Sequence, residues 1–348
     1  MKFLIYGAYG YTGKLISKLA KDKRLNPMLG GRDAIKTKAL ADELGFDYRT
    51  FDLSESDKLH EALNEVDLVL HCAGPFSSTA KVMMQACLST KTHYLDITGE
   101  IEVFELGASF DQKAKDAGIL IMPGVGFDVV PSDCLASHLK SKLPDATHLE
   151  LAFMSESSTS RGTALTMTQG IGKGGAIRKD GKIIPVPHVY ATRKLNLDGK
   201  EKSFVSIPWG DVSTAFRSTS IPNIMVYTAM HPGQIKKMKF VQKWRWFFNI
   251  GLVQSYLQNK VKNSVTGPSE QMREESHCYL WGEVKNAKGE THAAKLTTPE
   301  GYKLTAITSL MIVEKLSEQL SRTGFQTPSM AFGADLILNV ANTKREDI

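Results

Sequence analysis

The sequence predicts an α/β fold in which a doubly wound parallel sheet is interrupted by an inserted α+β unit that is mostly antiparallel. Two observations carry this prediction. Over residues 1–125, short apolar runs alternate with amphipathic stretches of helical spacing, as in strand–helix–strand units around a parallel sheet. After residue 130, alternating polar and apolar residues dominate. We therefore expect a first domain over 1–130, closed by 325–348, and an inserted substrate or dimerisation domain over 131–324.

Six short apolar runs predict the strands of the first domain. They cover residues 2–6, 27–30, 47–51, 67–72, 93–97 and 119–123. The stretch after the first run places Leu15, Ile16 and Leu19 on one helical stripe. Another helical stretch follows the fourth run, and Ser77 is its expected N-cap. Strands and helices thus alternate through the whole segment.

The inserted domain is expected to open with a helix near Pro131, capped by Ser132 or Asp133. Strands follow it, and hairpin turns are predicted at Asp198-Gly199 and around Gly289. A helical pattern returns over 304–320, and residues 330–342 predict one last short helix, which we expect to pack on the first domain.

Composition restricts the class of protein. The 348 residues are enough for about two domains. Four cysteines are scattered without CxxC spacing, which indicates a reducing compartment and no disulfide framework. The N-terminal apolar run is too short for a signal peptide, and no run reaches the ~18 apolar residues of a membrane span. We expect a cytoplasmic protein, with peripheral association at the inner face of the membrane as an alternative.

A glycine triplet, Gly7, Gly10 and Gly13, follows the first predicted strand and opens the first predicted helix. In that context the glycines allow a tight turn, a close approach of the backbone to a pyrophosphate and close packing of helix on strand. The helix N-terminus supplies amide N–H groups and the positive end of its dipole. The sequence therefore predicts a dinucleotide site, which takes in the intervening residues Tyr9, Tyr11 and Thr12.

The end of the second predicted strand indicates which dinucleotide binds. NAD sites usually place a carboxylate there, whereas this chain has Arg32, whose guanidinium can bind a 2′-phosphate through two parallel hydrogen bonds. We expect NADP(H) in preference to NAD(H). Asp33 is the competing observation, because a one-residue shift would put its carboxylate in that place. Asp52 is a candidate for the adenine end, or a cap of the helix that follows it.

Residues Cys72, Ala73, Gly74 and Pro75 end the fourth predicted strand, where the chain would pass the nicotinamide ribose. Gly74-Pro75 bares the backbone there, and an ordinary loop turn is the alternative.

Longer motifs resemble a known family. They are "HCAGPF" (71–76), "YLDITGE" (94–100), "PGVGFDVVPSD" (123–133), "TPEGYKLTA" (298–306) and stretches at 160–187 and 324–338. With them the chain resembles the saccharopine dehydrogenase-like oxidoreductases, including the trans-acting enoyl reductases of mycobacterial lipid synthesis. The resemblance implies a Rossmann domain, an inserted substrate domain and NADP(H)-linked reduction.

The resemblance also implies that Gly126, Phe127 and Asp128 form a loop beside the nicotinamide and the substrate. Saccharopine reductases follow this loop directly with proline, whereas here the proline comes later, at Pro131. This departure weighs against an amino-acid adduct as substrate.

Hydride reduction also needs a proton source. The candidates are His71, Asp96, Glu100, Asp128, His188 and Tyr190. Asp128 is the first choice, because glycines precede it at the expected domain junction. Ser160 and Arg161 precede a predicted helix and suggest a site for a substrate anion, although a simply capped surface helix explains them equally well. Tyr190 is a further substrate-binding candidate.

Other chemistries are not supported. Cys134 lies inside a predicted helix, where a buried core thiol is expected rather than a nucleophile. Tyr190 and Lys194 share the spacing of a helical catalytic pair but fall on a predicted strand. The nine histidines show no HExxH or His/Cys cluster, so no metal site is predicted. No nucleic-acid-binding module is recognisable.

Residues 236–262 combine many aromatic side chains with lysines. A membrane-surface contact, a lid over an acyl substrate, a homodimer interface and a buried helix are all consistent with this composition. Together these observations predict an NADP(H)-dependent oxidoreductase that reduces a C=C or C=N bond of a small, apolar acyl or lipid-like substrate. The alternatives are a saccharopine-type dehydrogenase and a non-catalytic NADP-binding protein that associates with a membrane or a partner.

Overall fold

The computed structural model describes residues 1–348 except 171–173, 243, 245–246, 248–249 and 320–321. The chain divides into two compact units. The first comprises Met1–Val130 and Tyr302–Phe332, and the second Pro131–Gly301 and Gly333–Ile348. The segment 325–348, expected to close the first domain, is therefore split between the two units.

The first unit contains a seven-stranded sheet with the order β15-β6-β5-β4-β1-β2-β3, and all its neighbouring strands are parallel. The strands are β1 (Phe3–Tyr6), β2 (Met28–Gly31), β3 (Tyr48–Thr50), β4 (Leu68–His71), β5 (His93–Asp96), β6 (Leu120–Met122) and β15 (Gly324–Phe325). This order, in which the chain reverses direction across the sheet beside β1, confirms the predicted doubly wound Rossmann fold. The six predicted apolar runs form six of the strands.

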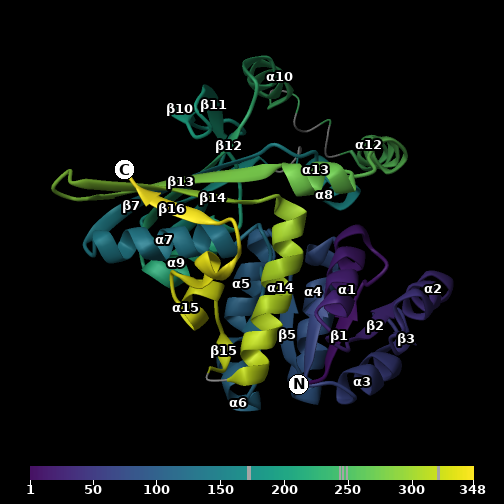
Figure 1. Ribbon diagram of the computed structural model, residues 1–348. Helices are drawn as coiled ribbons and strands as arrows, with labels where there is room; N and C mark the ends of the chain where they lie inside the picture. Colours follow the sequence, from purple (N-terminus) through teal and green to yellow (C-terminus); the bar gives the residue numbers. More distant parts are fainter. Residues whose placement is uncertain (171–173, 243, 245–246, 248–249, 320–321) are drawn as a thin grey trace. The chain divides into compact units, whose positions relative to one another are not determined.

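The first six helices of this unit lie between successive parallel strands, and the last two lie before and after β15 (Figure 1). They are α1 (Tyr11–Asp22), α2 (Ala34–Leu44), α3 (Ser56–Asn64), α4 (Phe76–Thr90), α5 (Ile101–Ser109), α6 (Asp111–Ala117), α14 (Gly301–Glu318) and α15 (Pro328–Phe332). Helix α1 buries Ile16 and Ala20 on its sheet-facing stripe. Helix α4 begins one residue before the expected cap: Pro75 is its N-cap, and Ser77 lies in its first turn.

The second unit contains a nine-stranded sheet whose main path is β10-β11-β12-β7-β13-β14-β16. Its strands are β7 (Ala146–Ser155), β8 (Gly175–Lys179), β9 (Lys182–Val186), β10 (Thr192–Asn196), β11 (Glu201–Ser206), β12 (Asn223–Ala229), β13 (His277–Asn286), β14 (Thr291–Pro299) and β16 (Lys344–Asp347). Among these strands, β12 and β7 pair in parallel and the other pairs are antiparallel. The mostly antiparallel prediction is confirmed, and Gly199 and Gly289 turn the two expected hairpins with φ near +87° and +90°.

The helices of the second unit are α7 (Val130–Lys142), α8 (Arg161–Gly170), α9 (Asp211–Thr219), α10 (Pro232–Gln242), α12 (Gly251–Ser264) and α13 (Glu270–Glu275). Helix α7 packs closely on β13, because Gly282 has no side chain: a Cβ there would lie 2.6 Å from Leu139 Cδ1. In the parts of the chain that the structure describes, no helix is both long and apolar enough to cross a membrane.

The single helix predicted over 330–342 is wrong. The chain leaves α15 at Gly333, whose φ of +85° is a left-handed conformation that ends the helix. A short 3-10 helix follows at Leu336–Asn339, and β16 then pairs with β14 in the second sheet. The sequence carries no strand pattern there, because β16 is short and all four of its residues are charged.

Candidate cofactor and reaction site

The turn after β1 has the backbone geometry that a dinucleotide requires. Gly7 adopts a φ of +84°, and a Cβ on it would lie 2.8 Å from the backbone nitrogen of Ala73. A Cβ on Gly13 would lie 2.3 Å from the carbonyl oxygen of Gly7. No side chain fits at either position, so the turn closes tightly against the start of α1 and against the loop after β4.

Helix α1 begins at Tyr11, with Gly10 as an N-cap that has no side chain to satisfy the first amide groups. The N–H groups of the first helical turn, which include those of Thr12 and Gly13, have no carbonyl partner inside the helix. Together with the positive end of the helix dipole, they form the donor set that a pyrophosphate needs. Tyr11 packs edge-to-face on Tyr302 of α14, with ring centroids 5.1 Å apart.

Tyr9 lies over the end of β2. A Cβ on Gly31 would be 2.5 Å from the Tyr9 ring, so the glycine allows the ring to lie directly on the backbone there. The Lys36 ammonium lies 5.8 Å from the centroid of the same ring. An aromatic ring and a cation thus lie together near the end of β2, where the 2′-phosphate is predicted to bind.

Arg32 and Asp33 are clearly distinguished by the structure. Arg32 directly follows β2 and is exposed. Asp33 is the N-cap of α2: its carboxylate accepts from the backbone N–H of Lys36 and forms an ion pair with the Lys36 ammonium at 2.9 Å. These hydrogen bonds lower the pKa of Asp33. The carboxylate that competed in the sequence is therefore already engaged, and the guanidinium is the group presented at the strand end.

Asp52 follows β3 and forms a local turn. Its carboxylate accepts from the N–H and the hydroxyl of Ser54, at 3.0 and 2.7 Å. The bonds from Ser54 lower its pKa, and Arg32 contributes in the same direction. The N-cap of α3 is Glu55 rather than Asp52. The charge of Asp52 thus balances part of the charge of Arg32 at this edge of the sheet.

The loop after β4, from Cys72 to Pro75, is held from both sides. The Cys72 N–H donates to the carbonyl of Tyr6 at 2.7 Å, and the Thr79 hydroxyl donates to the carbonyl of Ala73. Gly74 and Pro75 are exposed. This loop therefore presents bare backbone beside Gly7, as the sequence predicts for a segment that passes the cofactor.

Glu100 has a role that the sequence did not reveal. Both of its carboxylate oxygens accept hydrogen bonds from the N-terminus of α4, from the N–H of Phe76 and that of Ser77, each at 2.9 Å. A carboxylate bound in this way stabilises the positive end of the helix. Glu100 thus fixes the loop 72–75 from the side of α4, and it is a positioning residue rather than an accessible proton donor.

Two of the proton-source candidates are part of the core. His71 is fully buried, its Nε2 lies 2.9 Å from the Thr79 hydroxyl, and burial lowers its pKa to about 3, so it is neutral at physiological pH. Asp96 is also fully buried and accepts from the Tyr94 hydroxyl and from the N–H groups of Thr98 and Gly124. Burial raises its pKa to about 7, although these three donors favour the ionised form. Asp96 therefore links the end of β5 by hydrogen bonds to the loops at Thr98 and Gly124.

Asp128 lies next to this network. A Cβ on Gly99 would be 2.8 Å from its Oδ2, so the carboxyl packs against bare backbone one residue before Glu100. Burial raises the pKa of Asp128 to about 7, and the negative charge of Glu100 adds to the rise. The residue is nonetheless partly exposed. A carboxyl with these properties can hold a proton near neutral pH and release it to another group.

The loop that carries Asp128 is bound to α14. The Phe127 N–H donates to the Thr305 hydroxyl at 3.0 Å, and Thr308 donates to the carbonyl of Val125 at 2.8 Å. A Cβ on Gly126 would lie 2.7 Å from Thr305 Cγ2. Sequence reasoning missed Thr305, although it belongs to the "TPEGYKLTA" stretch; its contacts show that α14 sets the position of the 126–128 loop.

The substrate-binding candidates of the second unit are differently engaged. Ser160 is buried, and its hydroxyl accepts from the Thr163 N–H, so it caps α8. The Arg161 guanidinium donates to the carbonyl of Val265 at 3.1 Å. These contacts favour the capped-helix interpretation. Tyr190 is exposed in the loop before β10 rather than on a strand, and Lys194 forms an ion pair with Glu201.

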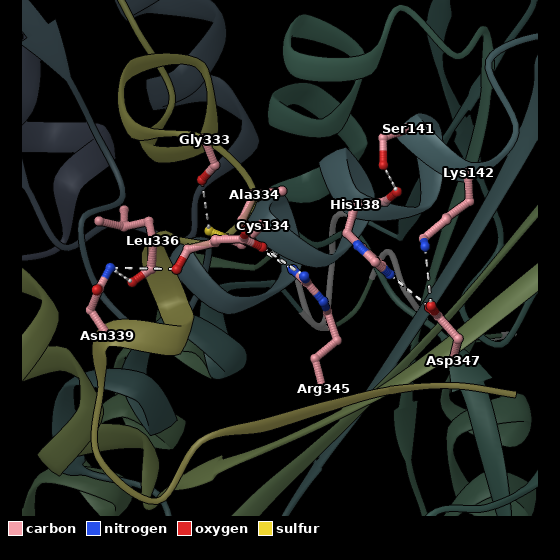
Figure 2. Close-up of polar contacts among 11 residues, drawn as sticks. Cys134, His138, Ser141, Lys142, Gly333, Ala334, Leu336, Asn339, Arg345 and Asp347 are labelled. Carbon is pink, nitrogen blue, oxygen red and sulfur yellow. Dashed lines mark hydrogen bonds and ion pairs between the residues drawn. The ribbon is translucent and has the colours of Figure 1, made fainter.

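Two further predictions concern the second unit. Cys134 is buried in α7, where burial raises its pKa, and its thiol contacts the carbonyl of Gly333 (Figure 2). Such a thiol is poorly nucleophilic. In the aromatic stretch 236–262, positions 243, 245–246 and 248–249 lie outside the described residues. The described aromatic residues there are exposed, which contradicts a buried helix: Phe240, Trp244, Phe247 and Tyr256.

Comparisons with known proteins agree with this geometry. Residues 3–122 match the family described as the saccharopine dehydrogenase NADP binding domain. A trans-acting enoyl reductase of Mycobacterium ulcerans is 24% identical over 206 residues, which cover 55% of this chain and 49% of that protein. A probable mitochondrial saccharopine dehydrogenase-like oxidoreductase of Arabidopsis thaliana is 30% identical over 150 residues, which cover 37% of this chain and 32% of that protein. The chain thus spans half or less of the length of these relatives.

A solved structure shares the whole architecture. Apo saccharopine dehydrogenase (L-Glu forming) from Saccharomyces cerevisiae superposes with a TM-score of 0.67 and 12% identity, covering 100% of this chain and 99% of that one. At this identity the match bears on the fold alone. The resemblance found in the sequence motifs is confirmed, and so is the prediction of NADP(H) as the dinucleotide.

Proposed function

We propose that this chain is an NADP(H)-dependent oxidoreductase, because residues 3–122 match the saccharopine dehydrogenase NADP binding domain family. The observation that carries the proposal is the turn at Gly7, Gly10 and Gly13, where added Cβ atoms would meet neighbouring backbone atoms, so that only glycines let the turn close against the N-terminus of α1. The residues present fit the cofactor: bare backbone and first-turn amides for the diphosphate, and Arg32 for the 2′-phosphate.

NADPH, when bound, supplies a hydride. The chain's own residues bind and orient it and provide the proton. The first turn of α1 holds the diphosphate, and the loop 72–75, fixed by Glu100, lies beside the turn. Asp128 is the proposed proton donor to the atom that does not receive the hydride, because its raised pKa keeps a proton available near neutrality. Gly126 and Phe127 are proposed to face the substrate from the same loop.

We propose a polarised C=C bond of an apolar acyl compound as the substrate. The support is the match to the Mycobacterium ulcerans trans-acting enoyl reductase and the delayed proline at Pro131, which departs from the saccharopine reductase pattern. A C=N bond formed between an amino acid and a 2-oxo acid is the second candidate. It is supported by the sequence match to the saccharopine dehydrogenase-like oxidoreductase of Arabidopsis thaliana.

The experiment is NADPH oxidation by the full chain with two substrate panels. One panel contains 2-enoyl thioesters of increasing chain length, and the other contains 2-oxo acids mixed with amino acids. We expect turnover with the thioesters that increases with chain length and is lost in Asp128→Asn, while Asp116→Asn, an exposed carboxylate change on α6, keeps it. Turnover only with the second panel would reject the acyl proposal. Tight NADPH binding without turnover in either panel would favour a non-catalytic role.

The exposed aromatic residues of 236–262 support a second proposal, association with an anionic membrane surface. Phe240 and Tyr256 are each about two-thirds exposed, at 65% and 68%, and lie in a lysine-rich segment. The fraction of protein that co-sediments with anionic vesicles should be lower for the double variant Phe240→Ser/Tyr256→Ser than for the parent. With neutral vesicles, the fraction of parent protein that co-sediments should stay at background. If instead the variant changes the mass measured by light scattering and not the sedimentation, a homodimer interface replaces the membrane proposal.

A further inference from the structure

Three side chains from distant parts of the second unit converge beside the end of β16. They are His138 of α7, His292 of β14 and Asp347 of β16, and one donor atom of each lies within 4.8 Å of the other two. The Nε2 atom of His138 is 2.7 Å from Asp347 Oδ1, and the Nε2 atom of His292 is 3.3 Å from the same oxygen. Figure 2 shows His138 and Lys142 of α7 both directed at Asp347.

The fold explains why these residues meet. Asp347 pairs with Ala294 of β14, and Ala294 pairs with Gly282 of β13, so the three form one row across the sheet. His292 is two residues before Ala294 and therefore shares its face of the sheet. The absence of a side chain at Gly282 lets Leu139 of α7 approach that row, which brings the neighbouring His138 to the end of the row.

From this geometry we propose that His138, His292 and Asp347 form a binding site for a divalent transition-metal ion of the Zn²⁺ type. Two imidazole nitrogens and one carboxylate oxygen are a ligand set that Zn²⁺ favours, with a water completing the tetrahedron. Zinc ligands lie about 2.0–2.1 Å from the metal, so neighbouring donors are about 3.4 Å apart in a tetrahedral site. The observed separations require side-chain shifts of only about 1 Å to reach this arrangement.

The surroundings suit such an ion. Lys142 lies 3.5 Å from the second oxygen of Asp347, Oδ2, while Oδ1 is the oxygen that both imidazoles approach. Lys142 thus orients the carboxylate without occupying a ligand position, as partners of metal ligands commonly do. The side chain of His138 is 11% exposed and that of Asp347 is 40% exposed. The site is therefore nearly buried at His138 and accessible to solvent at Asp347. An ion bound here would link α7, β14 and β16 and stabilise the attachment of the C-terminal strand.

The test uses the full chain freed of metal by a chelator, and Zn²⁺ alone as the probe, titrated by calorimetry. We expect one Zn²⁺ per chain and a rise in melting temperature on binding. His292→Ala and Asp347→Asn should each weaken binding by at least roughly tenfold, since the loss of a ligand exceeds the loss of a neighbour of a ligand. Both positions are partly exposed, so these variants keep the fold.

Two variants serve as controls. Lys142→Gln removes a cation that contacts the same carboxylate but is not a ligand, and it should weaken Zn²⁺ binding less than either ligand variant does. His148→Ala removes an exposed histidine of β7, outside the cluster, and should leave binding unchanged. Replacement of Zn²⁺ by Co²⁺ should give visible d–d absorption that is absent in His292→Ala. The proposal is overturned if the parent shows no saturable site, or if His292→Ala and Asp347→Asn bind as tightly as His148→Ala.

Discussion

The helix that begins at Tyr11 can approach β1 only because Gly13 has no side chain. A Cβ at Gly13 would lie 2.3 Å from the carbonyl oxygen of Gly7, far inside van der Waals contact with rigid backbone. The same turn places Gly7 against the backbone of Cys72 and Ala73. One close contact between two glycines thus sets the position of the helix N-terminus that we propose to bind the diphosphate.

Gly13→Ala should therefore weaken NADPH binding strongly and destabilise the fold by about 1–3 kcal/mol, the usual cost of overpacking. Cofactor fluorescence and urea unfolding measure the two effects. Gly251→Ala, at the start of α12 with nothing within 4 Å of the added Cβ, is the matched control and should be neutral in both. Equal behaviour of the two variants would contradict the role assigned to the turn.

Arg32→Ala should raise the Kd for NADPH and leave the Kd for NADH nearly unchanged, because only NADPH carries the 2′-phosphate. A charge-assisted bidentate contact of this kind contributes about 1.5–3 kcal/mol, or roughly 10- to 100-fold in affinity. The control is Arg49→Ala, which removes another exposed guanidinium, one that is engaged by Glu65 at 2.6 Å. If both cofactors lose affinity equally, Arg32 does not select between them.

The rate of NADPH-dependent reduction should fall as pH rises through about 7. Asp128 must be protonated to donate, and its pKa is raised to about 7 by burial first and by the charge of Glu100 second. Glu100→Gln removes that charge, so it should lower the pKa of Asp128 and move the midpoint of the kcat profile to lower pH. Glu102→Gln, a neutralisation in the first turn of α5, is the control. A midpoint that stays in place or moves upward in Glu100→Gln would exclude Asp128 as the donor.

Stability should decrease as pH rises across the range between about 4 and 7. Asp96 and Asp128 have pKa values near 7 in the folded chain against 3.8 as their ordinary value, so the folded state binds more protons over this interval. The contribution of these two carboxyls to the free energy of unfolding is fully present below about pH 4 and is lost as the pH rises through about 7. Each carboxyl adds a slope of up to about 1.4 kcal/mol per pH unit. The free energy of unfolding, measured with urea between about pH 5 and pH 8, should decrease less steeply with pH in Asp128→Asn than in the parent. An equal pH dependence in the two proteins would refute the raised pKa.

The first unit could be predicted closely from sequence because its signals are local. Each buried strand is an apolar run that ends in a turn, and each glycine of the turn after β1 is required by a contact within about ten residues of it or by its own φ. The choice between Arg32 and Asp33 also depends on a local feature, the capping of α2 by Asp33.

What escaped prediction depends on residues far apart in the chain. Glu100 holds the N-terminus of α4 across 24 residues, and Thr305 binds the Phe127 N–H across 178 residues. Neither pairing has a local pattern, since acidic and hydroxyl residues are common on any surface. The last strand, β16, escaped for a related reason: its residues are charged, and its place is set by pairing with β14 rather than by its own composition.

The cluster of His138, His292 and Asp347 is the clearest case of residues that are brought together only by the fold. Metal motifs are recognised in sequence by short spacings, and none is present here. His138 and Asp347 are 209 positions apart and meet only because α7 packs on the row of the sheet that ends at Asp347. A search by spacing cannot find such a set, whereas the folded chain brings it together.

Calorimetric titration of the unmodified chain with NADPH and, separately, with NADH tests the central claim most directly. Saturable binding of one NADPH per chain, tighter than that of NADH and accompanied by a rise in melting temperature, is the predicted result. If neither nucleotide produces heat or a shift in melting temperature, the turn at Gly7, Gly10 and Gly13 does not hold a dinucleotide, and the proposed chemistry fails with it.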